Sequence, residues 1–457
     1  MLMRKYPVSK KLKEISSIFS NAGFSAYLVG GAVRDWFLGK QCKDYDIATD
    51  ASPEQVQTIF CKTIPTGIEH GTITILYKGE QIECTTFRCE SDYSDGRRPD
   101  KINYVRSIEE DLSRRDFTMN AVAVSLKDGS IVDPFEGAKA IKSKIIKTVG
   151  SPEARFAEDG LRPVRAIRFS SQLEFSIDKE TLKAIPLSLE VCKKISIERF
   201  REEFVKMLLS EHPIIALKLL EDTGLLRIFL PELSACRNVE QKGMHKFDVL
   251  DHCFLACEAA PKENLTVRLA ALFHDIGKPQ VRQLNEFGDY TFYKHEFVSE
   301  KITRKIMRKL KFSNKEIEVV CLLVLNHMFN YTEDWSDAAV RRFIVKTGTE
   351  NIPALFDLRI ADGFALEARP INPVNLVNFQ KRIEKILETE NAFSLKDLKI
   401  NGNDLMEIGI PSGQKMGIIL KQLLETVLDD PSQNTKEQLL KIAKALNAGF
   451  SSEESKN

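Results

Sequence analysis

The segments LVGGAVRD, residues 28–35, and KDYDIAT, residues 43–49, decide the fold of the N-terminal part of this chain. The apolar residues 26–29 predict a short strand that ends at Gly30-Gly31 and leads into a helix carrying Arg34. Glycines at such a turn let backbone N–H groups approach an anion, and the start of a helix favours negative charge. A guanidinium one turn later adds a charge-assisted donor. The segment therefore predicts a phosphate-binding turn made by Gly30, Gly31 and Arg34.

Two aspartates follow this turn, Asp44 and Asp46. Residues two apart on a strand point to the same face, where two carboxylates repel each other unless a cation lies between them. Mg²⁺ bound by one or two carboxylates and by substrate phosphates satisfies this arrangement. A bare pair of this kind is more often a solvated strand face, but the preceding turn favours a metal site. Glu83, on a strand predicted at residues 81–87, is a candidate third catalytic carboxylate, and an ordinary exposed glutamate explains it about equally well.

The remaining periodicity predicts an α+β protein. An amphipathic helix is expected at residues 11–19, a hairpin joins residues 72–77 to 81–87 through Lys78-Gly79-Glu80, and a second turn at Asp128-Gly129 lies between residues 121–125 and 131–132. From about Ser151 the strand signals fade. Apolar residues then recur at helical spacing at residues 214–220, 266–274, 315–325, 417–428 and 437–446. A mixed head followed by an all-helical remainder is expected.

Composition excludes several classes of protein. The 457 residues carry 66 Lys and Arg against 65 Asp and Glu, so a net charge of +1 gives no overall attraction to nucleic acid or membrane. Nine cysteines without a C-x-x-C pair indicate reduced thiols in the cytoplasm. The first residues lack the apolar core of a signal peptide, and no apolar run approaches the ~20 residues of a membrane span. A cytoplasmic protein without a membrane partner is expected.

Four motifs in order resemble those of the class II tRNA nucleotidyltransferase family, which comprises CCA-adding enzymes and bacterial poly(A) polymerases. They are the glycine turn, the aspartate pair, RRDFTMNA at residues 114–121 and EDGLRPVRAIRF at residues 158–169. The similarity resumes at residues 400–410 and 413–427. The resemblance implies a polymerase-β-like nucleotidyltransferase head at residues 1–150 and a helical neck that binds nucleotide and RNA at 151–235. It further implies a helical body at 236–370 and a helical tail that binds tRNA at 371–457.

The resemblance also assigns roles to residues. Asp44 and Asp46 take the places of metal-binding, catalytic carboxylates, and Gly31 and Arg34 those of phosphate contacts. The other nucleotide-binding positions are Arg114, Arg115, Asp116, Asp159, Arg162, Arg165 and Arg168. Glu198 and Arg199, in a later motif, are expected to orient the neck.

Asp159 and Arg162 match the family's base-selecting pair, and a physical argument supports this role. If both lie on one helix, residues three apart are neighbours on one face. A carboxylate accepts from an exocyclic amine and a guanidinium donates to ring acceptors, so the pair suits C and A and opposes G and U. A surface ion pair is the simpler explanation of the spacing alone. Pro163 requires the helix to begin within one turn before it.

Residues 88–105 are polar and contain Gly and Pro, which predicts a mobile loop. They resemble the family's flexible loop, which is associated with the final A addition. The expected function is template-independent addition of CMP and AMP to the tRNA 3′ end, with Mg²⁺ as cofactor, CTP and ATP as substrates and pyrophosphate as product. An enzyme that adds only A and a poly(A) polymerase are the close alternatives.

Five of the seven histidines lie between residues 245 and 327. The ordered set of His252, His274, Asp275, His295, His327 and Asp362 looks like an HD-type metal-dependent phosphohydrolase domain. Imidazoles and carboxylates from several helices suit a divalent transition metal. An inherited helical scaffold with hydrogen-bonded histidines is the alternative for the cluster. For the whole chain, an HD-type phosphohydrolase whose head only binds nucleotides is the alternative from a different class.

Overall fold

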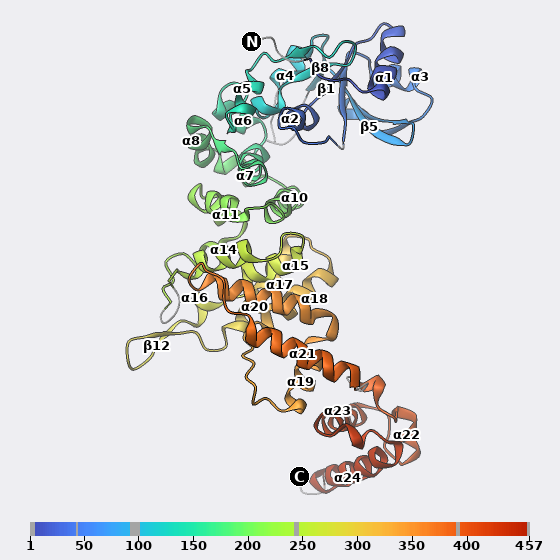
Figure 1. Cartoon of the computed structure of the whole chain (residues 1–457), viewed down its shortest axis with the longest axis vertical. Helices are drawn as coiled ribbons and strands as arrows, with labels where there is room; N and C mark the ends of the chain where they lie inside the picture. Colours follow the sequence, from blue (N-terminus) through green and yellow to red (C-terminus); the bar gives the residue numbers. More distant parts are fainter. Residues whose placement is uncertain (1–4, 43, 92–100, 242–245, 390–393, 455–457) are drawn as a thin grey trace. The chain divides into compact units, whose positions relative to one another are not determined.

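The computed structural model of the chain describes residues 5–42, 44–91, 101–241, 246–389 and 394–454. They form two compact units, and Figure 1 shows their elements. Unit 1 contains the residues up to Ala235 together with Lys309–Lys311, and unit 2 contains Cys236–Arg308 and the residues from Phe312 onward. None of the described helices has the length and apolar character that a membrane span requires.

The head of unit 1 is built on a mixed seven-stranded sheet in the order β3-β4-β5-β2-β1-β8-β9. Its central strands are β1 (Ala26–Val29), β2 (Asp46–Thr49) and β5 (Glu80–Thr86), and the others are β3 (Thr63–Gly67), β4 (Thr72–Tyr77), β8 (Ala123–Ser125) and β9 (Ile131–Val132). Strand β2 is antiparallel to β1 and parallel to β5. Parallel pairing places Asp46, the first residue of β2, opposite Glu83 of β5. The topology therefore brings together acidic residues 37 positions apart in sequence.

Local patterns in the head confirm most of the expected elements. Helix α1 (Lys10–Asn21) buries Leu12, Ile15 and Phe19 against the sheet. Strands β4 and β5 form the expected hairpin, and Lys78 and Gly79 both adopt positive φ in its turn, as a tight hairpin turn requires. Strands β8 and β9 also pair as expected.

The prediction of a loop over residues 88–105 is wrong at its two ends. Strand β6 (Arg88–Ser91) pairs antiparallel with β7 (Lys101–Tyr104), so the ends form a two-stranded stem. Polar composition concealed this pairing because the backbone, not the side chains, supplies the ladder. The middle of the predicted loop, residues 92–100, lies outside the described residues.

Helices follow the head within unit 1. Helix α6 (Pro152–Glu158) precedes α7 (Leu161–Leu173), which packs on α10 (Ile197–Leu208) and α11 (Pro213–Asp222). The guanidinium of Arg168 on α7 is buried against the carboxylate of Glu203 on α10. This ion pair therefore connects α7 to α10.

Unit 2 is mostly helical. Helices α14 (Val249–Ala259), α15 (Leu265–Phe273) and α20 (Ile352–Ala365) pack on one another, and α18 (Asn314–Asn326) packs on α15. Helices α17 (His295–Lys309), α21 (Val374–Thr389), α23 (Gln414–Asp429) and α24 (Lys436–Glu454) follow the expected periodicity.

The expectation that all residues after the head are helical is wrong in detail. Strands β12 (Gln283–Leu284) and β13 (Tyr290–Thr291) form a small hairpin, and β11 (Ser176–Ile177) pairs with β10 (Ile145–Ile146) in unit 1.

Candidate functional site

Asp44, Asp46 and Glu83 bring negative charge to one end of the central strands. Burial and then the neighbouring Glu83 carboxylate raise the pKa of Asp46, Asp44 adds to this rise, and Arg115 opposes it. Asp44 lies in the bend before β2, so the prediction that both aspartates occupy one strand is wrong. Among the described residues of the head, the ligand atoms of no three acidic or histidine side chains come within 4.8 Å of one another. These carboxylates repel one another, and a hard divalent cation, which prefers oxygen ligands, would relieve that repulsion.

The glycine turn opens next to these carboxylates. Gly30 has φ of 69°, and a Cβ placed there would lie 3.4 Å from Asp46 Oδ2 and 3.5 Å from Arg115 Nη1. Because Gly30 has no side chain, the space beside Asp46 and Arg115 stays open to a ligand. Gly31 begins helix α2 (Gly31–Phe37), and a Cβ there would be 3.5 Å from Arg34 Nη2. The turn thus lies between a negative group and two arginines, which suits a metal-bound phosphate.

The RRD motif is held by ion pairs and hydrogen bonds. Arg114 and Arg115 both pair with the buried Asp111, at 2.8 and 3.1 Å. Asp116 accepts hydrogen bonds from the Phe117 backbone N–H at 2.8 Å and from Asn120 Nδ2 at 3.1 Å. Sequence reasoning missed Asp111, whose place three and four residues before the two arginines was the available signal.

Asp116 joins the head to the neck. Its Oδ2 accepts from Arg165 Nε at 2.8 Å. Burial alone would raise the pKa of Asp116, but the adjacent Arg165 and the hydrogen bond from Asn120 lower it to about 2. The Oδ1 atom of Asn120 in turn accepts from Arg34 Nη1 at 3.0 Å. One polar chain thus connects the helix after the glycine turn to α7.

The expected Asp159–Arg162 geometry is corrected by the structure. Helix α7 begins at Leu161, which confirms a start within one turn before Pro163. Asp159, however, is the extended C-cap of α6, so it does not share a helix with Arg162. Gly160 lies between the two helices, and a larger residue would not fit there because its Cβ would lie 2.7 Å from the carbonyl oxygen of Val191.

Asp159 and Arg162 instead have separate partners. The carboxylate of Asp159 pairs with both terminal nitrogens of Arg199, at 2.8 and 3.3 Å. The guanidinium of Arg162 pairs with Glu158 and donates to the carbonyl oxygens of Arg155 and Arg114, each at 3.1 Å. Sequence reasoning missed Glu158, although its spacing of four residues before Arg162 was visible. Each member of the expected base-selecting pair is thus held by a neighbour.

Arg168 differs from the other predicted nucleotide contacts. Its side chain is 7% exposed, pairs with Glu203 and lies 3.7 Å above the ring of Phe169. Arg165, by contrast, is 32% exposed while it pairs with Asp116. The structure places Arg165 beside the RRD motif and Arg168 in the packing between α7 and α10.

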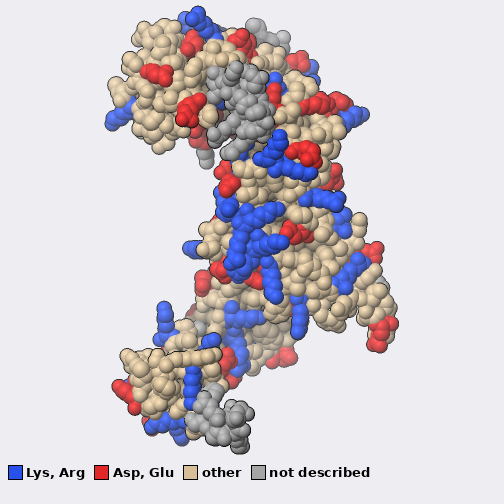
Figure 2. Space-filling model, turned by 180° about the vertical axis from the view of Figure 1, so that it is seen from behind, with Lys and Arg blue, Asp and Glu red and all other residues tan. Residues whose placement is uncertain are grey.

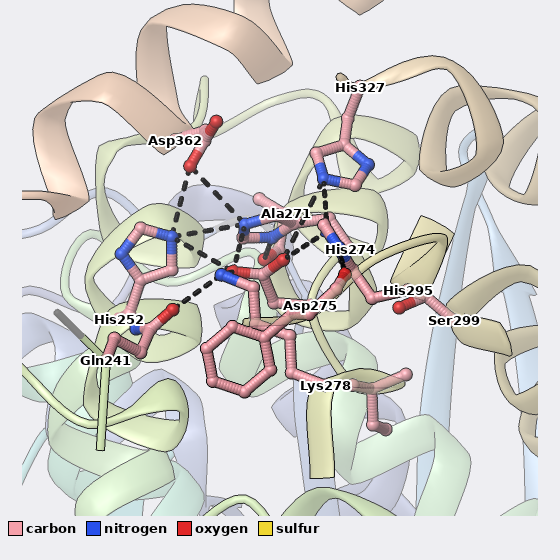
Figure 3. Close-up of polar contacts among 12 residues, drawn as sticks. Gln241, His252, Ala271, His274, Asp275, Lys278, His295, Ser299, His327 and Asp362 are labelled. Carbon is pink, nitrogen blue, oxygen red and sulfur yellow. Dashed lines mark hydrogen bonds and ion pairs between the residues drawn. The ribbon is translucent and has the colours of Figure 1, made fainter. Parts of the chain in front are cut away.

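The six expected ligands of the second site come together in unit 2. All are buried, and they come from α14, the end of α15, the start of α17, the end of α18 and α20 (Figure 3). The Nε2 atoms of His252 and His274 are 3.2 Å apart, and Asp362 Oδ1 lies 3.1 Å from the first and 3.4 Å from the second. These separations match ligands that share one ion at bond lengths of about 2.1 Å.

Asp275 faces two groups of ligands. Its Oδ2 lies 3.5 Å from His252 Nε2 and 3.3 Å from His274 Nε2, whereas its Oδ1 lies 3.1 Å from His295 Nε2 and 3.8 Å from His327 Nε2. Burial opposes ionisation, but His274 and Lys278 hold the pKa of Asp275 well below its usual range. Carboxylate and imidazole groups together form a donor set that suits divalent transition metals.

Contacts around the cluster orient its ligands. His274, His295 and His327 each place Nδ1 at 2.7–2.8 Å from a backbone carbonyl oxygen, so Nε2 points into the cluster. Two basic residues that sequence reasoning missed also bind its carboxylates. Lys278 lies 2.6 Å from Asp275 Oδ2 and also contacts Gln241, and Arg359 donates to Asp362 Oδ2 at 2.8 Å. The sequence offered a signal for each, since Lys278 is the last residue of HDIGK and Arg359 is the first residue of RIAD.

Comparison with known proteins shows the family to which this chain is similar. Three family models match, described as the poly A polymerase head domain at residues 26–147, the probable RNA and SrmB-binding site of polymerase A at 174–236, and tRNA nucleotidyltransferase domain 2 at 292–443. The CCA-adding enzyme of Lactobacillus johnsonii is 36% identical over 93% of both chains. This chain belongs to the family of CCA-adding enzymes.

Other members support the same assignment. The CCA-adding enzyme of Ligilactobacillus salivarius is 35% identical over 96% of this chain and 95% of its own. The crystal structure of the Bacillus stearothermophilus CCA-adding enzyme in complex with CTP is 29% identical, with a TM-score of 0.73, and the match covers 99% of this chain and 100% of that one. The family match confirms the expected nucleotidyltransferase and the α+β fold of head and helical parts.

Asp116→Asn should destabilise the protein at neutral pH because it leaves the partly buried Arg165 without its counter-charge. The folded pKa of about 2 lies below the usual 3.8, so the ionised carboxylate contributes about 2 kcal/mol above pH 4. That contribution is lost as the pH falls from about 4 to 2. Thermal unfolding of the wild type and the variant should show a gap at pH 7 that has roughly halved by pH 3. An equal gap at both pH values would contradict this, and exposed Asp334→Asn is the control.

Proposed function

We propose that this chain adds CMP and AMP to the 3′ end of tRNA, completing CCA, with CTP and ATP as substrates and pyrophosphate as product. The observation that carries the proposal is that three carboxylates, those of Asp44, Asp46 and Glu83, interact electrostatically beside the glycine turn. Gly30 of this turn lies next to Asp46 and the guanidinium of Arg115. Acidic groups that hold a metal, next to donors that hold a phosphate, are the parts that phosphoryl transfer requires. Nine free cysteines agree with a reducing compartment, and we place the reaction in the cytoplasm.

Asp44 and Asp46 would hold Mg²⁺, with Glu83 as the third carboxylate. When bound, the ion supplies Lewis acidity at the α-phosphate and a counter-charge for the departing pyrophosphate. The protein's own part is positional. Gly30 and Gly31 present backbone N–H groups, and Arg34, Arg114 and Arg115 supply positive charge around the triphosphate. Asp116 and Arg165 hold this set against the neck and approach the ribose.

Asp159 and Arg162 would read the edge of the incoming base. The carboxylate of Asp159 accepts the exocyclic amine of C or A, and Arg162 donates to the adjacent ring acceptor. Arg199 and Glu158 hold the two side chains ready in the absence of a nucleotide. A protein template of this kind accepts both substrates without a nucleic-acid template. We assign Arg168 an indirect role, through the packing of α7.

The helical parts would hold the tRNA. Figure 2 shows Lys and Arg side chains gathered on the helical segments, and the exposed Lys301, Lys305 and Arg308 follow one face of α17. Phosphate contacts of this kind are independent of sequence, as recognition of all tRNAs requires. We extend the same role to the tail, residues 371–457.

Asp46→Asn and Asp44→Asn should each lower nucleotide incorporation by at least 100-fold because the metal ligands are lost. The assay supplies Mg²⁺, labelled CTP or ATP, and tRNAs that end before CCA or after CC. Incorporation of C, C and A that then stops supports the proposal. Incorporation of A alone, on the CC-ended tRNA, would show instead an enzyme that adds only A. Long A tracts would show a poly(A) polymerase. Glu80→Gln, the exposed first residue of β5, is the matched control, and full activity in the aspartate variants would refute this site.

Arg199→Ala should reduce discrimination against GTP and UTP because it frees the Asp159 carboxylate from its fixed position. We expect the ratio of kcat/KM for CTP over UTP to fall about 10-fold, which is the effect of losing one oriented hydrogen bond. Arg201→Ala, two residues along α10, serves as the matched control. If Arg199→Ala lowers the rate with all four nucleotides equally, Arg199 acts on stability and not on selection.

A second candidate function belongs to the histidine–carboxylate cluster of unit 2. Six buried ligands from five helical segments converge there, and we propose that they hold one or two divalent transition-metal ions. When bound, such an ion would supply the activation of water needed to hydrolyse a phosphate ester to an alcohol and phosphate. The observation that favours this over a hydrogen-bonded scaffold is the orientation of three Nε2 atoms into the cluster by backbone carbonyls.

His274→Ala should remove most of the divalent metal bound by the protein, since His274 contributes to both ligand groups. Metal content after dialysis against Mn²⁺ is the measurement, with circular dichroism to show that the helices persist. His212→Ala, outside the cluster, is the control, and Asp362→Asn is an independent variant of similar size to its parent residue. Unchanged metal content in His274→Ala and Asp362→Asn would remove the metal site.

A further inference from the structure

A small cavity lies next to the histidine–carboxylate cluster in unit 2. Its volume is about 170 Å³, and its lining includes Arg359 and Gly363 of α20 and the segment Phe329, Asn330 and Tyr331 that follows His327. The opposite wall includes Ile371, Asn375 and Leu376. Two of its lining segments lie close in sequence to ligands of the cluster: Gly363 follows Asp362, and Phe329 is two residues after His327.

Asp362 separates the cluster from the cavity's arginine. Its Oδ1 atom faces His252 and His274, and its Oδ2 atom accepts from Arg359 Nη1 at 2.8 Å. A guanidinium has five N–H donors, and one bond to Asp362 leaves the others for further partners. The side chain of Arg359 is 32% exposed, so its charge is accessible while one end is fixed. Among the described residues that line the cavity, Arg359 is the one with a charged side chain.

The cavity's size limits what it can hold. At about 30 Å³ for each water, it corresponds to five or six water molecules. This is enough for a phosphate group and a few attached atoms, but small beside the 300 Å³ or more of sites that enclose a whole drug-sized ligand. The exposed Asn330 and Asn375 supply amides on its lining. A larger molecule would therefore insert only its phosphate end.

We infer that this cavity is an anion subsite that binds the terminal phosphate of a phosphomonoester, with Arg359 as its charged donor. The inference rests on the second proposed function and deepens it, because it names the substrate class that the cluster receives. Arg359 acts on the substrate by a charge-assisted, forked set of hydrogen bonds. Its bond to Asp362 fixes the guanidinium beside one carboxylate of the cluster. Phe329 and Tyr331 supply apolar walls that exclude water from one side.

Binding of inorganic phosphate to the full-length protein tests the subsite directly. Isothermal titration is carried out with the metal-free and the Mn²⁺-loaded protein, for wild type, Arg359→Gln and Arg359→Lys. We expect Arg359→Gln to weaken phosphate binding 10- to 100-fold, which is the effect of losing charge-assisted hydrogen bonds. Arg359→Lys should recover part of this loss, since it keeps the charge but not the fork. Arg342→Gln, an exposed arginine of α19 (Asp337–Thr347) that pairs with Glu425 and Asp429, is the matched control, and Mn²⁺ content is measured for every variant.

Hydrolysis separates the inference from the function on which it rests. With p-nitrophenyl phosphate and with a short RNA ending in a 3′-phosphate, Arg359→Gln should raise KM about 10-fold while kcat changes little. Comparison of the two substrates tells a small-molecule phosphate from an RNA end. Unchanged phosphate affinity and KM in Arg359→Gln would overturn the subsite and leave the hydrolytic function intact. Absence of hydrolysis in every Mn²⁺-loaded protein, with Arg359-dependent phosphate binding, would overturn the function and leave the subsite. Loss of Mn²⁺ together with phosphate binding in Arg359→Gln alone would show that Arg359 only holds Asp362, and would also overturn the subsite.

Discussion

The partly buried ion pair between Asp116 and Arg165 joins the sheet of the head to helix α7. A carboxylate and a guanidinium taken out of water are stable only when each satisfies the other and their remaining bonds are filled. Asn120 and the Phe117 backbone N–H meet this need on the acidic side. Asn120 also accepts from Arg34. The glycine turn, the RRD motif and the first half of α7 are all connected through this one pair and its hydrogen bonds.

The same rule applies to the residues proposed to select the base. Asp159 and Arg162 would each be a costly partly buried charge without a partner. Arg199 and Glu158 supply those partners while no base is present. A base with the right donor and acceptor would exchange with them at little net cost, whereas one with the wrong pattern would leave a charge unpaired. Selection then depends on the protein's internal ion pairs as much as on the base.

The second unit concentrates a different chemistry. Three of its imidazoles are fixed by backbone carbonyl oxygens, and Lys278 and Arg359 bind its two carboxylates. Rigid ligands with fixed second contacts are what a metal site needs to hold its geometry. The chain thus carries two acidic centres, one of oxygen donors in unit 1 and one of mixed nitrogen and oxygen donors in unit 2.

Local sequence determined the elements of this protein and its ligand types. Hydrophobic spacing, glycines at turns and the position of Pro163 set where α1, α7 and the β4–β5 hairpin lie, because each depends on neighbours a few residues away. Residue types alone indicated a phosphate turn, a carboxylate group and a histidine cluster. Only the tertiary structure decided the partners. Asp159 meets Arg199 across 40 residues and Asp362 meets His252 across 110, and the β6–β7 stem forms from a polar segment. Such pairings depend on how helices and strands pack, and no periodicity within one segment encodes them.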